Sequence, residues 1–289
     1  MAGSITSSSN RTGRPCANAG VGGRGSGRYG AVVRPFLDHP TPIAFAHRGG
    51  AADAPENTME AFAAAVDLGF RYLETDVHLT ADGVLVAFHD ASLDRVTDRS
   101  GAIAELTWRE VADATVRRPG SGEMGTGRIA RMADLLEAFP DARFNIDPKA
   151  DASVEPLAAL INATRSAERI CVGAFSDRRV ARVRALVGDE LCTGLGPRAV
   201  TRLRLASLGL PVGRPDGDCA QVPPALGGVP VADRRLVDTA HRLGLQVHVW
   251  TIDDPDEMHR LCDLGVDGIM TDRPAVLRDV LEARGQWAG

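Results

Sequence analysis

Short apolar runs alternate with amphipathic stretches along the chain from residue 43 onward. Such runs, rich in valine, isoleucine and phenylalanine, are typical of buried strands and occupy residues 43–46, 72–77, 143–147, 170–173, 191–194, 219–222, 246–250 and 268–271. Between them apolar residues recur at helical spacing, which predicts helices at 58–68, 132–139, 154–166, 177–186, 197–207, 233–243 and 255–264, and from 274 onward. Each of these predicted strands is therefore followed by a predicted helix.

One further strand-like run, 84–88, breaks this alternation. Only residues 80–83 separate it from the run at 72–77, and this connection is too short for a parallel crossover. It predicts a β-hairpin instead. A short helix at 108–114 and a glycine-rich loop at 119–127 follow, so the segment 79–128 is predicted to be an insertion.

The remaining eight strand–helix units predict the fold class. Eight such units in about 250 residues favour a closed barrel over an open doubly wound sheet. We therefore expect an α/β protein, a (β/α)8 TIM barrel with a small insertion after strand 2. The first helix carries a start signal, because Asn57 as N-cap and Glu60 three residues later form a capping-box-like pair.

Composition narrows the class of protein. Residues 1–35 are dominated by Gly, Ser, Arg and Asn, which predicts a disordered tail without a secretory signal, ahead of a catalytic domain at 36–289. A formal net charge of −5 argues against binding nucleic acid by bulk phosphate neutralisation. No apolar run approaches the roughly 18–20 residues of a membrane span, so stable membrane insertion is not expected. Five scattered cysteines without a C-x-x-C pair favour buried thiols in a reducing, cytoplasmic location over a disulfide framework or a zinc site.

Lysine occurs once in the chain, at Lys149, whereas the other 32 of 33 basic residues are arginines. Arginine thus serves wherever a generic cation suffices. Lysine and arginine are not interchangeable at tight sites, so the surviving lysine indicates a place that needs a compact ammonium group. Chance survival of one lysine is the alternative.

Potential chemistry is concentrated between Ala44 and Asp90. Glu74 and Asp76 are two residues apart in an extended run, so both carboxylates are predicted to lie on one face. Two acids on one face repel each other, and a divalent cation with oxygen ligands, Mg²⁺ or Ca²⁺, would resolve the repulsion. A solvated strand face is the simpler alternative. His47-Arg48 before this pair and His89-Asp90 after it favour a functional site.

The ordered motifs His47-Arg48-Gly49, Pro55-Glu56-Asn57-Thr58, Glu74-Thr75-Asp76 and His89-Asp90 resemble those of glycerophosphodiester phosphodiesterases. The resemblance continues in the 145–149 run, in Val249-Trp250-Thr251 and in the 265–272 run, and it covers the chain from about residue 43 to its end. Two positions depart from the family pattern: Asp147 stands where the family usually has Glu, and Ala174 where it often has Ser.

The resemblance implies metal-dependent hydrolysis of glycerophosphodiesters to sn-glycerol 3-phosphate and an alcohol, an activity of lipid and glycerol metabolism. One Mg²⁺ or Ca²⁺ would be held by Glu74, Asp76 and Asp147. His47 and His89 would be the general acid–base pair, with a cyclic phosphate as the intermediate. Arg48 and Lys149 would bind the phosphate.

Other positions leave two readings open. Trp250 is either a wall of the substrate site or barrel filling, and Glu56 either orients the metal site or Arg48, or complements a helix N-terminus. Asn57 is a supporting residue. Asp272 follows the last strand and shares the expected active face. The other histidines are predicted to be structural or exposed.

Three functions remain in view. The leading one takes a small-molecule glycerophosphodiester as substrate. A lysophospholipase D or sphingomyelinase D-like activity would use the same site with a lipid leaving group, and apolar content of the insertion near the site would favour it. A non-catalytic phosphopolyol-binding protein is the third, although a binder needs no pair of proton-transferring histidines. The sequence does not indicate an oligomeric state.

Overall fold

The computed structural model describes residues 34–40, 42–117 and 124–288. The predicted tail therefore lies, but for its last two residues, outside the described part of the chain, as does most of the glycine-rich loop at 119–127. The division into a tail and a catalytic domain stays a prediction.

In the described residues, eight parallel strands form the barrel in the order β8-β7-β6-β2-β1-β13-β12-β9. In chain order they are β1 (Ile43–His47), β2 (Tyr72–Leu79), β6 (Arg143–Pro148), β7 (Ile170–Val172), β8 (Cys192–Thr193), β9 (Cys219–Val222), β12 (Gln246–Val249) and β13 (Gly268–Thr271). The two end strands meet through a single parallel pair, Gly194 with Cys219, and a bond from the Leu195 amide to the Cys219 carbonyl at 2.8 Å. The predicted (β/α)8 fold is confirmed.

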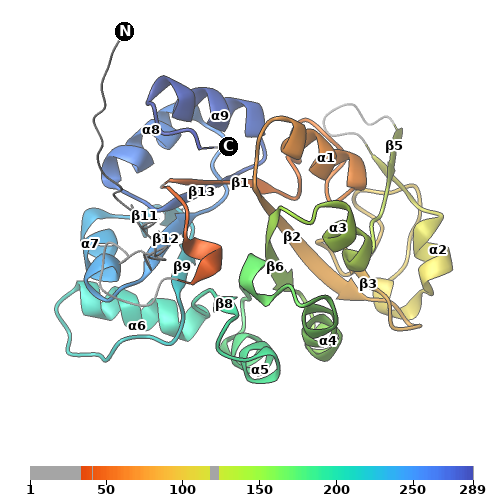
Figure 1. Ribbon diagram of the computed structural model, residues 1–289, viewed down its shortest axis with the longest axis horizontal. Helices are drawn as coiled ribbons and strands as arrows, with labels where there is room; N and C mark the ends of the chain where they lie inside the picture. The colour runs from red at the N-terminus through yellow and green to blue at the C-terminus, as the bar shows by residue number, and fades with distance from the viewer. Residues whose placement is uncertain (1–33, 41, 118–123, 289) are drawn as a thin grey trace, which may run out of the picture.

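Helices cover the outside of the barrel (Figure 1). Within the described residues they are α1 (Met59–Asp67), α3 (Met132–Ala138), α4 (Val154–Thr164), α5 (Asp177–Val187), α6 (Pro197–Ser207), α7 (Arg234–Arg242), α8 (Pro255–Leu264) and α9 (Pro274–Ala283). These bounds fall within a few residues of the predicted ones. Helix α4 ends two residues early because Arg165 adopts a left-handed conformation, with φ of 51°.

The predicted start of the first helix is wrong by one residue. The N-cap of α1 is Thr58, whose side chain accepts a hydrogen bond from the Ala61 amide. Asn57 cannot cap the helix, because its backbone is left-handed (φ 58°) and its buried side chain accepts a hydrogen bond from the Thr75 hydroxyl at 2.7 Å.

The predicted hairpin is present. Strand β3 (Leu85–Ala87) pairs antiparallel with the end of β2, and the segment continues through α2 (Trp108–Ala112), β4 (Thr115–Arg117) and β5 (Met124–Arg128). Figure 1 shows this segment to one side of the barrel, beyond β3. It has its own small core, which includes Val86, Phe88, Ile103 and Val111.

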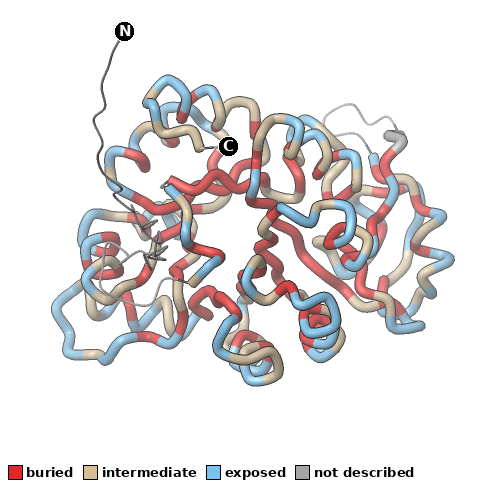
Figure 2. The backbone as a smooth tube through the Cα atoms, in the orientation of Figure 1, coloured by how far each residue is buried: buried red, intermediate tan, exposed pale blue. Residues whose placement is uncertain are grey.

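Side chains alternate between the barrel interior and the helices, as the period of two in a strand requires. Leu73, Phe144 and Ile146 face outward into the layer packed against the helices, which is the larger core. Figure 2 shows the barrel strands as largely buried stretches of the chain, whereas exposed residues recur along the surrounding helices.

The end of the barrel at which the strands begin is closed by a short 3₁₀ helix, Pro35–Leu37. The ring of Phe36 meets that of Tyr72 edge-on, with the centroids 5.2 Å apart, and the Tyr72 hydroxyl donates to the Phe36 carbonyl at 2.7 Å. Burial is the main reason that the pKa of Tyr72 is raised to about 12.

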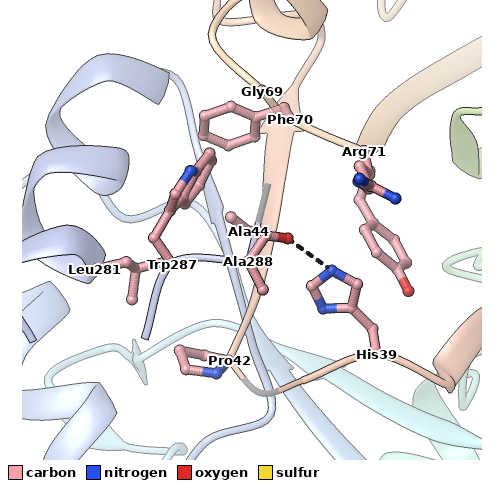
Figure 3. A pocket seen from close by; sticks show the side chains of 10 residues that line it. His39, Pro42, Ala44, Gly69, Phe70, Arg71, Leu281, Trp287 and Ala288 are labelled. Carbon is pink, nitrogen blue, oxygen red and sulfur yellow. Dashed lines mark hydrogen bonds between the residues drawn. The ribbon is translucent and has the colours of Figure 1, made fainter. Parts of the chain in front are cut away.

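The end of the described chain is fixed beside this closure. The His39 imidazole donates to the Ala288 carbonyl at 3.0 Å, and Trp287 meets Phe70 edge-on at 5.2 Å (Figure 3). The small hollow between them is lined by Pro42, Ala44 and Leu281, so this end of the barrel is filled by packing.

We predict that Phe36→Ala lowers the free energy of unfolding by about 3–5 kcal/mol, because it opens a cavity among fully buried rings. Urea unfolding measures the change. The same substitution at Phe175, which is 68% exposed, serves as the matched control and should change stability by about 0.5 kcal/mol or less. Equal losses in the two variants would contradict the account of the barrel closure.

Candidate active site

The carboxyl ends of the strands surround a cavity of about 470 Å³. Glu74 and Asp76 both line it, as the period of two predicts, although they are 6% and 2% exposed. Asp147 pairs with Asp76 in the register of β2 and β6, so the third carboxylate stands beside the second. The polar side of the cavity is completed by His47, Arg48, His89, Asn145 and Lys149.

Lys149 lies between two of the acids. Its Nζ is 2.7 Å from Asp76 Oδ1 and 2.9 Å from Asp147 Oδ2. The other oxygens of the two acids, Asp76 Oδ2 and Asp147 Oδ1, are buried without a hydrogen bond from the described residues. The single lysine of the chain thus stands next to the place where the sequence indicates a cation.

The buried charges shift one another's titration. Burial, with the charge of Asp76, raises the pKa of Glu74 to about 7. Burial also raises the pKa of Asp147, against the effect of the Lys149 ammonium. The pKa of Lys149 is raised as well, since the charges of Asp76 and Asp147 outweigh its burial. The site therefore holds more negative charge than its own cations compensate.

His47 is oriented by a carboxylate from the far end of the sequence. Its Nδ1 lies 2.6 Å from Asp272 Oδ1, which follows β13, and its Nε2 is 3.7 Å from Glu74 Oε2. An ionised carboxylate only accepts, so Nδ1 carries the proton and Nε2 remains for proton transfer. Burial opposes protonation, but the charges of Glu74 and Asp272 raise the pKa of His47 above its ordinary value.

His89 has a matching arrangement. Its Nδ1 donates to Asp90 Oδ1 at 2.6 Å, and the His78 imidazole donates to the His89 carbonyl at 3.1 Å. Arg95 binds both oxygens of Asp90, and these bonds are the main reason that the pKa of Asp90 is lowered to about 2. The hairpin therefore brings a second histidine with a protonated Nδ1 to the same cavity as His47.

Arg48 connects the two halves of the site. Its Nη1 donates to Glu56 at 3.2 Å, its Nε is 3.4 Å from Asp76 Oδ2, and its backbone amide donates to Glu74 at 3.2 Å. Glu56 also accepts two bonds from Arg95, at 2.7 and 3.0 Å. Of the two readings of Glu56, the arrangement favours the orientation of Arg48. The backbone amide of Asn57 donates to the Arg48 carbonyl at 2.9 Å and so supports the backbone that carries Arg48.

The opposite side of the cavity is apolar. It comes from the segments that follow β7, β8, β9 and β12, including the start of α6 and the short strand β10 (Ala225–Leu226), and its members are Phe175, Leu195, Pro197, Val200, Pro223, Leu226 and Trp250. The rings of Phe175 and Trp250 meet edge-on at 5.6 Å, and Trp250 both lines the cavity and packs against the barrel interior, so both readings of this residue hold in part. Of the described residues of the insertion, only His89 lines the cavity, and apolar residues such as Val86, Phe88 and Ile103 fill the insertion's own core.

Sequence reasoning missed several contributors to the site. Arg95 joins Asp90 to Glu56 over a separation of 39 residues, and no local pattern indicates such a bond. Gln221 donates to Asn145 Oδ1 at 2.8 Å in the base of the cavity. Gln221 and Asn145 lie on the interior side of predicted strands, and this position could have indicated that they face the cavity. Asp272 was placed on the active face, but its bond to His47 was not foreseen.

Comparison with known proteins now decides the family. Residues 47–276 match the family described as "Glycerophosphoryl diester phosphodiesterase family". The chain belongs to this family. It is 43% identical over 270 residues to a probable glycerophosphodiester phosphodiesterase 2 of Mycobacterium tuberculosis, covering 90% of this chain and 98% of that protein. It is 31% identical over 266 residues to human lysophospholipase D GDPD1, covering 81% and 84%.

Solved structures share the fold. A putative family member from Silicibacter pomeroyi superposes with a TM-score of 0.72 at 24% identity, covering 86% of this chain and 96% of that one. An Oleispira antarctica phosphodiesterase, solved in complex with the product sn-glycerol-3-phosphate, has a TM-score of 0.69 at 23% identity, covering 83% and 97%. Among the described residues, no helix of this chain combines the length and hydrophobicity of a bilayer span.

We predict that Asp272→Asn lowers the pKa of His47, because the amide no longer stabilises the imidazolium by charge. An NMR titration of the His47 ring measures this directly. Asp90→Asn is the matched control, since Asp90 contacts His89 and should leave the His47 titration in place. A rise in the His47 pKa on loss of the Asp272 charge would contradict this assignment.

Proposed function

We propose that the chain hydrolyses glycerophosphodiesters to sn-glycerol 3-phosphate and an alcohol. One observation carries the proposal: two histidines, each with Nδ1 held by a carboxylate, line a single cavity with two cations and three acids. Phosphodiester hydrolysis needs one group to accept a proton and another to donate one, and imidazoles do both near neutral pH. A phosphopolyol-binding protein would need neither.

The chemistry of the acids in the cavity suits a divalent cation, although oxygens of all three do not lie within 4.8 Å of one another in this structure. Asp76 Oδ2 and Asp147 Oδ1 are buried without a hydrogen bond from the described residues, and burial, with the charge of Asp76, raises the pKa of Glu74 to about 7. An all-oxygen set suits Mg²⁺ or Ca²⁺. We propose that Glu74, Asp76 and Asp147 hold one such ion, which would supply Lewis-acid stabilisation of charge on the phosphate oxygens.

The side chains of the site divide the remaining work. Arg48 and Lys149 bind the anionic phosphate. The glycerol hydroxyl next to the phosphate attacks phosphorus and gives its proton to one imidazole Nε2, while the other imidazole protonates the departing alkoxide. A cyclic phosphate results, and water opens it with the two histidines in exchanged roles. Asp272 and Asp90 keep each Nε2 directed to the cavity.

Buried, free thiols at Cys171, Cys192, Cys219 and Cys262 support a reducing, cytoplasmic location as part of this proposal. The substrate is a small molecule, and no nucleic acid is required.

We predict that His47→Ala and His89→Ala each lower kcat for glycerophosphocholine by about 10²–10⁴-fold, because each removes one proton-transfer group. Released glycerol 3-phosphate is measured with Mg²⁺, Ca²⁺ or Mn²⁺ present. His259→Ala, which removes a histidine that does not line the cavity, is the control. EDTA should abolish turnover and one of the three cations restore it.

Two outcomes would contradict the proposal. If neither glycerophosphocholine nor glycerophosphoethanolamine is turned over with any of the three cations, the proposed activity is wrong. Full activity in EDTA would contradict the metal ion but not the proton-transfer roles of the two histidines.

A second substrate class has its own support. Phe175 and Leu226 are 68% and 73% exposed and line the cavity across from the phosphate-binding side. An exposed apolar wall next to a polar reaction centre fits an acyl chain attached to the phosphodiester. We propose that lysophospholipids, or sphingolipids of the same form, are accepted as well; the relative in human is named a lysophospholipase D.

Phe175→Ala is predicted to raise KM for lysophosphatidylcholine by roughly tenfold or more, because it removes apolar contact worth about 1.5–3 kcal/mol when fully formed. The KM for glycerophosphocholine should stay unchanged, since that substrate has no acyl chain. Leu208→Ala, which alters an exposed apolar side chain outside the cavity, is the control. Parallel increases for both substrates would count against an acyl-chain site.

A further inference from the structure

Three thiols meet inside the barrel. Cys171 on β7, Cys192 on β8 and Cys219 on β9 are fully buried, and their sulfur atoms lie within 4.8 Å of one another. The Cys171 and Cys219 sulfurs are 3.9 Å apart. Among the described residues, no other group of three or more His, Cys, Asp or Glu ligand atoms is this close. Neighbouring strands hold them in place, because Cys171 pairs with Cys192 and Cys219 bridges to Gly194.

The spacing of the sulfurs matches metal coordination. Zinc–sulfur bonds are about 2.3 Å long, so two such bonds at an angle of about 115° separate their sulfurs by roughly 3.9 Å. Thiolates select soft ions such as Zn²⁺ and Cu⁺ over Mg²⁺ and Ca²⁺. The neighbours of the thiols are apolar, including Phe36, Phe45 and Met270. This cluster therefore differs in chemistry from the carboxylate site above it.

A histidine nearby has an unused nitrogen. His248 is fully buried, and its Nδ1 has no hydrogen-bond partner among the described residues. The amide of Gln246 donates to the Leu37 carbonyl at 3.2 Å, which turns its oxygen toward His248 Nε2 at 3.0 Å. Nε2 therefore carries the proton and Nδ1 a lone pair. An anchored second nitrogen of this kind is usual for a metal-binding histidine.

His248 also lies on the correct strand. Gln246 and Cys219 are paired in the register of β12 and β9, so His248 is two residues above the level of that thiol. Its ring is not within the 4.8 Å group, so the side chain has to move toward the thiols in order to bind. Three cysteines and one histidine form a recurrent structural zinc set.

We propose that Cys171, Cys192 and Cys219 bind one thiophilic d¹⁰ cation, Zn²⁺ or Cu⁺, inside the barrel beneath the active-site cavity. His248 is the fourth ligand for Zn²⁺, whereas three sulfurs suffice for Cu⁺. Each coordinating thiol releases its proton to solvent, so binding weakens as the pH falls. Buried cysteines that act only as small apolar residues are the alternative.

The ion has a route from the cavity. Gly173 and Gly194 follow Cys171 and Cys192 by two residues, on the cavity side, and present no side chain. The Gln221 amide covers this gap: its Oε1 is 2.5 Å from where a Gly173 Cβ would stand and 3.3 Å from that of Gly194. The Gln221 side chain is a flexible cover, and it is bonded to Asn145 Oδ1 at 2.8 Å.

The test uses the full chain, reduced with a phosphine, stripped of metal and supplied with excess Mg²⁺ to occupy the carboxylate site. Zn²⁺ and Cu⁺ are titrated separately against chromophoric chelators of known affinity. We expect one equivalent of each to bind, and Ser at any of the three cysteines to weaken binding at least tenfold. Cys262→Ser, which alters a cysteine outside the cluster, is the matched control. His248→Ala should weaken Zn²⁺ but not Cu⁺.

X-ray absorption of the Zn²⁺-loaded, unsubstituted chain keeps the proposal testable even if a Ser variant fails to fold. Three sulfur neighbours at about 2.3 Å would support the site. Coordination by oxygen and nitrogen alone, the absence of a bound equivalent, or affinity unchanged in all three Ser variants would overturn it.

Discussion

The structure of the site depends on holding three acids at one end of a buried barrel. Glu74, Asp76 and Asp147 share that end because parallel strands bring their carboxyl ends together, and each is nearly inaccessible to water. Burial penalises a charged carboxylate, so the acids need cations close by. Lys149 and Arg48 supply part of that charge. Other polar groups of the site bind these acids, the cations near them or the two histidines.

The same constraint explains why the chain returns to the site so often. Asp272, which follows the last barrel strand, binds His47, and Glu56, in the connection between β1 and α1, binds Arg48. Arg95 from the insertion binds Glu56 and also Asp90, which holds His89. The insertion thus serves the site through His89, Asp90 and Arg95. Its remaining apolar residues stabilise the insertion itself.

What the sequence revealed follows from local periodicity. A period of two correctly placed Glu74 and Asp76 on one face, and the four-residue connection correctly indicated the hairpin. Local pattern failed where the outcome depended on distant contacts. Asn57 satisfies the rule for a helix cap, yet its side chain is taken by Thr75 and the cap passes to Thr58. Apolar residues of the insertion near the site were the feature that would favour a lipid substrate, whereas the apolar side of the cavity comes from the segments after β7, β8, β9 and β12, which carry no shared pattern.

The barrel interior is best understood as stacked layers of different chemistry. Because inward residues are two apart, Cys171 and Cys219 lie directly below Gly173 and Gln221, which line the cavity. The thiols thus lie two residues, roughly 6.5 Å along a strand, below residues that line the cavity. The sequence shows no spacing motif among the five cysteines, because the three that meet come from different strands and are brought together only by strand pairing. The alternation that assembles the acids therefore assembles the thiols too, and the two layers differ only in which residues stand at the inward positions.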